Sequence, residues 1–239
     1  MENFSFKNVS FAYPEQENKA LRNISFEVNQ GEFLILCGPS GCGKSTLLRH
    51  LKTYLTPHGV LTGEILFGGK ALNEVDERTQ SKEIGFVLQS PENQVVTDKV
   101  WHELAFGLES LGLDTPTIRR RVAEVAAFFG IENWFYKNVT ELSGGQKQLL
   151  SLASVMAMSP KILVLDEPTA QLDPIAAADF LALLGKINRE LGITVILTEH
   201  RLEEAFPFAT RVIVMEKGEI VCDDAPDQVG LHLRDKDSG

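Results

Sequence analysis

The sequence predicts an α/β fold built on a mainly parallel sheet, with an N-terminal antiparallel β layer and an inserted α-helical subdomain. The first residues alternate between apolar and polar side chains, as half-buried strands do. A middle segment has the spacing of amphipathic helices, and the rest alternates strands with helices, which favours parallel pairing and right-handed crossovers. We expect one domain over 1–239, with the core and β layer in 1–89 and 146–239 and the helical subdomain in 90–145.

Each expected element follows from local composition. Short runs rich in β-branched and aromatic residues predict strands, and wider apolar spacing predicts helices. The expected strands are 3–13, 24–28, 33–37, 63–69, 84–88, 161–165 and 193–197, followed by a hairpin of 211–216 and 219–221. The expected helices are 145–158, 174–191, 201–208 and the helical stretch 100–129, in which Thr115 would cap a helix that Pro116 opens and Gly130 ends.

The composition bounds the possible functions. The chain has 239 residues, 44% of them apolar, which is enough for a sizeable core. A net charge of −10 disfavours nucleic-acid binding, which needs a basic surface. No apolar run is long enough to cross a membrane, and the first residues carry no secretion signal. The scattered Cys37, Cys42 and Cys222 fit a reduced, cytosolic protein without a metal cluster.

A glycine-rich stretch between a strand and a helix is the strongest functional signal. It has the pattern of the phosphate-binding loop in P-loop nucleoside triphosphatases with a RecA-like core. Its glycines let backbone N–H groups converge on an anion, and the helix start adds positive charge. Lys44 would reach the β- and γ-phosphates, Ser45 would ligate Mg²⁺ and Thr46 would bind near the α-phosphate. The loop comprises Gly38, Pro39, Ser40, Gly41, Cys42, Gly43, Lys44, Ser45 and Thr46.

Two acidic residues end a later buried strand. Asp166 and Glu167 follow the apolar run 162–165. Asp166 would hold Mg²⁺ directly or through water, and Glu167 would polarise an attacking water as general base. The alternative is a surface acidic pair at a strand end, which the phosphate-binding loop upstream disfavours.

A second candidate anion site lies at a helix start. Ser143 can cap this helix, and Gly144 and Gly145 expose N–H groups at its positive end. One nucleotide cannot easily reach both anion sites within one core. A second copy of the chain, facing head to tail, could supply the second site; otherwise the stretch is a plain helix cap.

These motifs together resemble the ATP-binding cassette (ABC) ATPases over nearly the whole chain. The order is Walker A at 38–46, Gln89, the signature Leu142-Ser143-Gly144-Gly145-Gln146, Walker B at 162–167, Asp173 and His200. The resemblance implies ATP and Mg²⁺ as cofactors, sandwiched between two identical or related cassettes. The signature residues Ser143, Gly144, Gly145 and Gln146 would then contact the nucleotide held by the opposite cassette.

The resemblance also implies roles for single residues. Tyr13 corresponds to the aromatic residue that stacks on adenine, although alone it would more often be an ordinary strand residue. Gln89 corresponds to the glutamine that touches Mg²⁺ or the attacking water and couples to the transporter. Asp173 corresponds to the residue that crosses the dimer interface, and it could equally cap a helix. His200 corresponds to the switch histidine that bonds the γ-phosphate.

Two positions depart from the usual family pattern, and a cysteine lies in the phosphate-binding loop. Leu149 stands where the family often has Arg, and Arg201 stands where it often has Asp, so the contacts of both loops are open. Cys42 lies in the phosphate-binding loop, where positive charge would favour its thiolate. Alkylation of this thiol would then block ATP binding unless ATP protects it.

Segments 90–97, 100–107 and 198–204 resemble the ATPases of energy-coupling-factor transporters, which import vitamins and metal ions such as cobalt or nickel in prokaryotes. This resemblance implies a second cassette, a transmembrane coupling protein in a groove lined by 90–106, a substrate-binding membrane protein, and a place at the cytoplasmic face of the cell membrane. Residues 90–106 could equally be internal core, and the chain could be half of a two-cassette protein. A soluble ABC ATPase acting on ribosomes or DNA, a conventional importer ATPase and a non-hydrolysing regulatory cassette are the alternatives.

Overall fold

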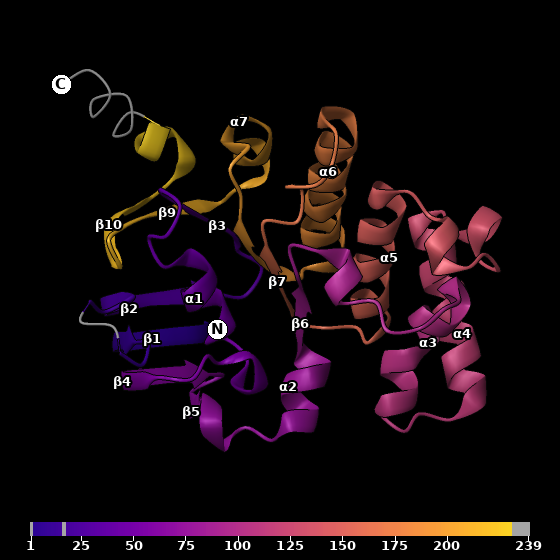
Figure 1. Cartoon of the computed structure of the whole chain (residues 1–239), viewed down its shortest axis with the longest axis horizontal. Helices are drawn as coiled ribbons and strands as arrows, with labels where there is room; N and C mark the ends of the chain where they lie inside the picture. Colours follow the sequence, from indigo (N-terminus) through magenta and orange to yellow (C-terminus); the bar gives the residue numbers. More distant parts are fainter. Residues whose placement is uncertain (1, 16–17, 231–239) are drawn as a thin grey trace.

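The computed structural model describes residues 2–15 and 18–230, which form two sheets and a group of helices. The first sheet is antiparallel, in the order β2-β1-β4-β5, and occupies one end of the molecule (Figure 1). Its strands are β1 (Glu2–Ala12), β2 (Leu21–Asn29), β4 (Val60–Phe67) and β5 (Lys70–Ala71). The predicted N-terminal antiparallel layer is therefore confirmed.

The second sheet has six strands in the order β10-β9-β3-β8-β7-β6. All neighbours from β9 to β6 pair in parallel, and only the edge strand β10 runs antiparallel. The strands are β3 (Phe33–Cys37), β6 (Ile84–Val87), β7 (Ile162–Asp166), β8 (Thr194–Thr198), β9 (Arg211–Glu216) and β10 (Glu219–Asp224). The mainly parallel sheet follows the prediction, because its central strands β3, β7 and β8 are buried, mainly apolar runs that need cover on both faces.

Alternate residues of the central strands face two different cores. On β3, Phe33 and Ile35 pack in a cluster with the larger helices, whereas Leu34 and Leu36 pack with α1 and the antiparallel sheet. Because successive side chains of a strand point to opposite faces, one apolar strand fills both cores. The central sheet is thus held between the β layer and the helices.

The helices follow the predicted order, except for an additional helix, α2, and a different cap on α4. The helices are α1 (Lys44–Arg49), α2 (Glu77–Glu83), α3 (Val100–Ser110), α4 (Thr115–Phe129), α5 (Gly144–Ala157), α6 (Pro174–Leu191) and α7 (Leu202–Ala205). The short, polar α2 was not predicted, because only its cap at Asp76 marks it. The cap of α4 is Asp114 and not Thr115: its carboxylate accepts the N–H of Thr117 at 3.2 Å. Gly130 ends α4 in the left-handed conformation, as predicted.

Short 3-10 turns connect these elements: Thr53–Leu55, Leu72–Glu74, Pro91–Asn93, Glu132–Trp134, Val139–Glu141 and Phe206–Phe208. Helices α3, α4 and α5 lie together at the end opposite to the β layer (Figure 1). The core of these helices is continuous with the helical face of the central sheet. The exact division at 90 and 145 stays a prediction.

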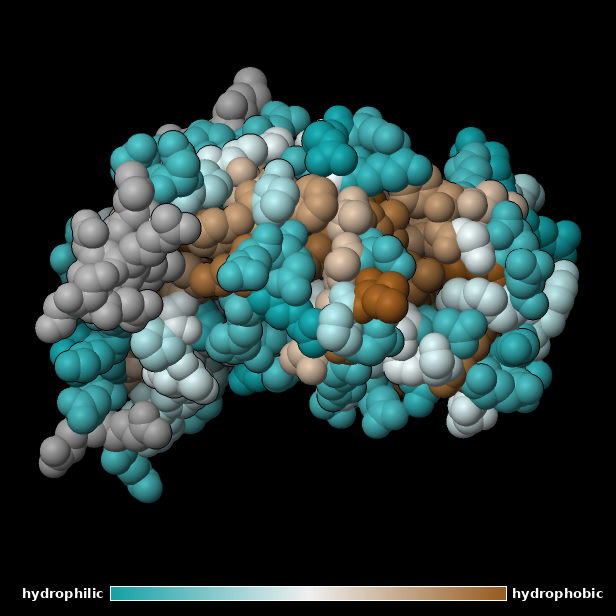
Figure 2. Space-filling view, turned by 90° about the horizontal axis from the view of Figure 1, so that it is seen from above, coloured by the Kyte–Doolittle hydropathy of each residue, from teal (hydrophilic) through white to brown (hydrophobic). Residues whose placement is uncertain are grey.

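Figure 2 shows the molecule from above the view of Figure 1. Hydrophilic residues cover most of this face, and apolar side chains are visible in a band along its middle. Among the described residues, no helix combines the length and apolar character that crossing a membrane requires.

Candidate nucleotide-binding site

The loop between β3 and α1 has a backbone that only glycine permits at two points. Gly38 has φ 140°, and a side chain there would collide with the carbonyl oxygen of Met215 in β9. Gly43 has φ 108°, and its Cβ would lie 2.6 Å from the carbonyl oxygen of Ala20. These positions explain why the chain has glycine where the loop is pressed against its neighbours.

The Lys44 side chain is buried inside this loop. Its Nζ donates hydrogen bonds to the carbonyl oxygens of Gly38 at 2.8 Å and Pro39 at 3.1 Å. The loop therefore holds the ammonium group at the place where the sequence predicts that a phosphate binds.

Two oxygens suited to a hard cation lie together, one in the loop and one at the end of β7. Ser45 Oγ donates to Asp166 Oδ1 at 2.9 Å, and Thr198 Oγ1 donates to the same oxygen at 2.9 Å. Asp166 and Thr198 are register partners at the carboxyl ends of β7 and β8. A serine hydroxyl and a carboxylate are ligands that Mg²⁺ accepts beside phosphate oxygens, so Ser45 and Asp166 fit the predicted metal site.

Both carboxylate oxygens of Glu167 are bonded to side chains from other loops. Gln89 Nε2 donates to Oε2 at 2.9 Å, and His200 Nε2 donates to Oε1 at 2.8 Å. The Glu167 N–H donates to the hydroxyl of Thr198 at 2.9 Å, and Glu167 has a φ of 47°, which is unusual outside glycine. The fold thus brings together Gln89, Glu167 and His200, which are far apart in sequence.

A pocket joins Tyr13 to the phosphate-binding loop. The Tyr13 hydroxyl lies 3.0 Å from Thr46 Oγ1, and the pocket reaches Glu167. Asn18, Lys19 and Ala20 also line it, and sequence reasoning missed them because no motif marks the connection between β1 and β2. The remaining lining residues are Ser40, Gly41, Gly43, Lys44 and Ser45.

The signature stretch forms the predicted helix cap. Ser143 Oγ accepts the N–H of Gln146 at 3.3 Å, and Gln146 Oε1 accepts the N–H of Ser143 at 3.0 Å. A side chain at Gly144 would meet no atom within 4 Å, so this end of α5 is open. Within the described residues, no hydrogen bond or ion pair links 143–146 to the loop 38–46, and the fold does not bring these two predicted anion sites together.

Asp173 caps α6 in the way that its position before Pro174 predicts. Its Oδ1 accepts the N–H groups of Ile175 and Ala176, both at 3.0 Å. Nearby, the guanidinium of Arg201 donates to the carbonyl oxygen of Leu172 at 2.9 Å. Arg201, which departs from the family pattern, therefore binds the segment just before Asp173.

The expectation of a thiolate at Cys42 is wrong. Cys42 is buried, and burial raises the pKa of its thiol despite the opposing effect of Lys44. The sequence shows that Lys44 lies close to Cys42, but it does not show that Cys42 is buried. The other departure, Leu149, is a partly buried side chain packed against the helical core.

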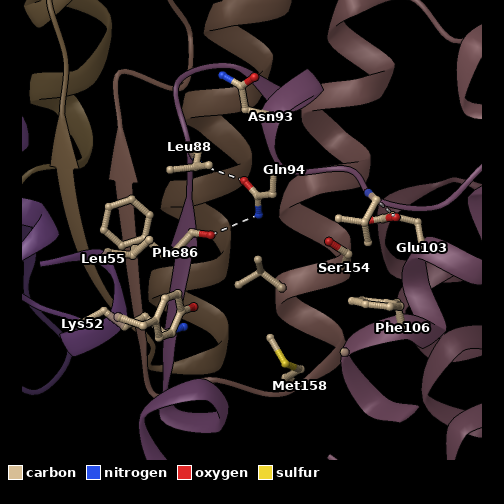
Figure 3. A pocket seen from close by; sticks show the side chains of 14 residues that line it. Lys52, Leu55, Phe86, Leu88, Asn93, Gln94, Glu103, Phe106, Ser154 and Met158 are labelled. Atoms are coloured by element: carbon tan, nitrogen blue, oxygen red, sulfur yellow. Dashed lines mark hydrogen bonds between the residues drawn. The ribbon is translucent and has the colours of Figure 1, made fainter. Parts of the chain in front are cut away.

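A separate groove lies beside β6, between the central sheet and helices α3 and α5 (Figure 3). The Gln94 side chain bonds to the edge of β6, accepting from Leu88 N at 2.9 Å and donating to Phe86 O at 3.1 Å. The Glu103 carboxylate holds the N–H groups of Val96 and Thr97. The lining residues are Lys52, Tyr54, Leu55, Phe86, Leu88, Asn93, Gln94, Val96, Glu103, Phe106, Gly107, Ser154, Val155 and Met158.

Residues 90–106 serve both the groove and the core. Val96 and Phe106 line the groove, and their exposed fractions are 63% and 44%. Val100 and Leu104, in contrast, are fully buried in the helical core. The segment therefore contributes some residues to the groove and others to the core.

A glycine-rich loop between a buried strand and a helix, with an acidic pair at the end of another parallel strand of the same sheet, defines a P-loop nucleoside triphosphatase. Residues 21–170 match the sequence model of the ABC transporter family, and the chain belongs to that family. By sequence and fold the chain is an ATP-binding cassette of this family.

Several relatives carry the same kind of name. A putative ABC transporter ATP-binding protein of Bacillus anthracis is 53% identical over 95% of this chain, and one of Methanosarcina acetivorans is 40% identical over 91%. The chain spans only 41% and 34% of the length of these two proteins.

Solved cassettes share the fold. The cbiO1 protein of Clostridium perfringens, described as part of the ABC transporter complex cbiONQ, superposes with a TM-score of 0.86 and is 31% identical; the match covers 97% of this chain and 92% of cbiO1. The cassette MJ0796, solved as a dimer in a post-hydrolysis state with ADP and phosphate, gives a TM-score of 0.81 at 28% identity and covers 93% and 98% of the two chains.

Proposed function

We propose that this chain hydrolyses ATP with a second cassette and thereby drives a membrane importer, of the energy-coupling-factor type. The observation that carries the enzymatic part is the placement of Glu167. Its carboxylate lies between Gln89 and His200, beside the loop that holds Lys44. In this arrangement Glu167 accepts a proton from water as the water attacks the γ-phosphorus.

The neighbouring residues then have separate tasks. Lys44 and the N–H groups of residues 38–46 bind the phosphates, and Tyr13 stacks on adenine. His200 donates a hydrogen bond to the γ-phosphate, and Gln89 orients the water. Ser45 and Asp166 hold Mg²⁺, which neutralises phosphate charge when it is bound.

A second cassette completes the site in this proposal. The capped start of α5 has open N–H groups at Gly144 and no contact with the loop 38–46 of its own chain among the described residues. In a head-to-tail pair, Ser143, Gly144, Gly145 and Gln146 of one cassette reach the γ-phosphate held by the other, and Asp173 lies at the contact. The second cassette is either another copy of this chain or a related domain.

The groove beside β6 is the proposed contact with a transmembrane coupling protein. Its exposed apolar side chains suit an apolar helix of a partner better than water. Leu88, Asn93 and Gln94 form one wall, and Gln89, which contacts Glu167, follows Leu88 directly. A partner that shifts this wall would thus change the position of Gln89, so docking and hydrolysis are connected.

The similarity to cbiO1 supports the energy-coupling-factor type, and with it a substrate-binding membrane protein as a further partner. The cassette would lie at the cytoplasmic face of the cell membrane. The net charge of −10 supports this function over an ATPase that acts on ribosomes or DNA. A conventional importer is the alternative that shares every feature of the ATP site.

Two measurements test this function. Phosphate release should be easily detected for the wild type and lost in Glu167→Gln, and a wild type without ATP hydrolysis contradicts the enzymatic part. For the membrane part, Val96→Glu should reduce the fraction of the chain that sediments with membranes of its source cell. The matched control is Val60→Glu, since Val60 is 69% exposed and lies on the distant β4. Equal sedimentation of both variants and the wild type contradicts docking in the groove.

A further inference from the structure

A buried carboxylate that the nucleotide site does not use ties the loop after β8 to the loop after β7. Glu199 is 3% exposed. Its Oε2 accepts a hydrogen bond from the Thr169 hydroxyl at 2.6 Å. Its Oε1 accepts the backbone N–H groups of His200 at 2.8 Å and Arg201 at 3.1 Å. We propose that Glu199 is a positioning residue, which fixes the backbone of His200 relative to the loop of Glu167 and so sets the contact between their side chains.

The burial of Glu199 argues that its hydrogen bonds matter. In the part of the chain that the structure describes, its partners are Thr169 and two backbone N–H groups, and no cationic side chain pairs with it. Burying a carboxylate is costly unless strong hydrogen bonds stabilise its charge. Here the three donors all belong to the two loops that carry Glu167 and His200. The cost of burial is therefore offset by ordering these loops against each other.

A second connection runs in parallel. Arg201 donates to the carbonyl oxygen of Leu172 at 2.9 Å, so the loop 199–201 is bonded to the loop 167–172 at two points besides the contact between His200 and Glu167. The loop 167–172 leads directly into Asp173. Displacement of His200 thus requires movement of the segment before Asp173, and the two loops move as one unit. This inference rests on the proposed roles of Glu167 and His200.

A simpler explanation is that Glu199 only satisfies N–H groups before the short helix α7, whose N-cap is Arg201. The two explanations differ at Thr169. This residue lies in the other loop and makes none of the hydrogen bonds of the cap. A capping role predicts that loss of the Thr169 hydroxyl leaves hydrolysis unchanged, whereas a positioning role predicts slower hydrolysis.

The test compares kcat, KM and Tm of Glu199→Ala, Thr169→Val and the double variant. We expect kcat to fall roughly tenfold to hundredfold in each single variant with KM within about twofold, because a misplaced catalytic group slows the chemical step. The double variant should be no slower than the slower single variant, because both substitutions break the same hydrogen bond between the two loops. Glu199→Gln and Thr169→Ser keep hydrogen-bonding groups and should retain most of the activity.

The control for general loss of stability is Asp114→Ala, which removes the cap of α4. It should lower Tm and leave kcat unchanged. Three results would each overturn the proposal. Thr169→Val could have the kcat of the wild type, the losses of kcat in the two single variants could add up in the double variant, or Asp114→Ala could lose as much kcat as the variants of Glu199 and Thr169. If Glu199→Ala does not fold, the kcat of Thr169→Val is compared with that of Thr169→Ser. Equal values of kcat then overturn the proposal. Wild-type hydrolysis by His200→Ala would instead contradict the proposed role of His200.

Discussion

The imidazole Nε2 of His200 lies 2.8 Å from Oε1 of Glu167, although the two residues follow different strands. The contact places a hydrogen-bond donor beside the candidate base. We expect His200→Ala to lower kcat about 10²- to 10³-fold, as the loss of one donor to developing charge does. KM for ATP should stay within about threefold, because the donor acts mainly in the transition state. Phosphate-release kinetics measure both values, and a variant with more than about a tenth of wild-type kcat contradicts this role.

The buried ammonium of Lys44 should be needed to bind nucleotide. Lys44→Ala removes a charge-assisted hydrogen bond of about 1.5–3 kcal/mol, so Kd for ATP should rise roughly tenfold or more. Isothermal titration calorimetry provides the measurement. Lys7→Ala is the control, because Lys7 is exposed on β1 and pairs with Glu64. Equal affinities of the Lys44 variant and the wild type would exclude contact with the phosphates.

Cys42 should be the slower of two thiols to be alkylated. It is buried with a raised pKa, whereas Cys222 is partly exposed in β10. Iodoacetamide near neutral pH should therefore modify Cys222 first, and the rate at Cys42 should increase as the pH rises and the thiolate forms. Peptide mass spectrometry over a time course follows both residues. Faster labelling of Cys42 than of Cys222 would contradict the effect of burial.

The buried Lys52 should make the free energy of unfolding increase as the pH rises above about 8. Burial lowers the pKa of Lys52 from 10.5 to about 8. Between these pH values the unfolded chain binds a proton that the folded chain lacks, so the free energy of unfolding increases with pH. Relative to Lys52→Met, the wild type should gain at most about 3 kcal/mol from pH 7 to 10.5. Urea unfolding of both proteins measures the difference, and parallel pH curves would contradict the prediction.

The sequence predicts most of the fold because its strands and main helices are strongly patterned. Buried strands such as 33–37 and 162–165 are uninterrupted apolar runs, and Ser143 and Gly130 mark helix ends by local chemistry. The polar α2 lacks an apolar periodicity, so only tertiary packing reveals it.

The candidate site is predicted only where a motif marks it. Gln89, Glu167 and His200 were each found from a motif or a resemblance, but their mutual contacts arise from the strand order β8-β7-β6. Lys19 belongs to no motif. Thr169 and Glu199 lie beside Glu167 and His200 in sequence, but their mutual contact depends on which loops the fold brings together. The burial of Cys42 is likewise a tertiary property, and this explains why its expected thiolate was wrong.

In the proposed mechanism ATP joins two cassettes face to face. Light scattering of Glu167→Gln with and without Mg-ATP measures this pairing, with Glu167→Gln/Ser143→Arg as the matched control, because Ser143 does not contact the loop 38–46 of its own chain. ATP should double the mass of the single variant, and the double variant should bind ATP and stay monomeric. A single variant that binds ATP tightly with no change in mass, or a dimer that persists in the double variant, would contradict this mechanism.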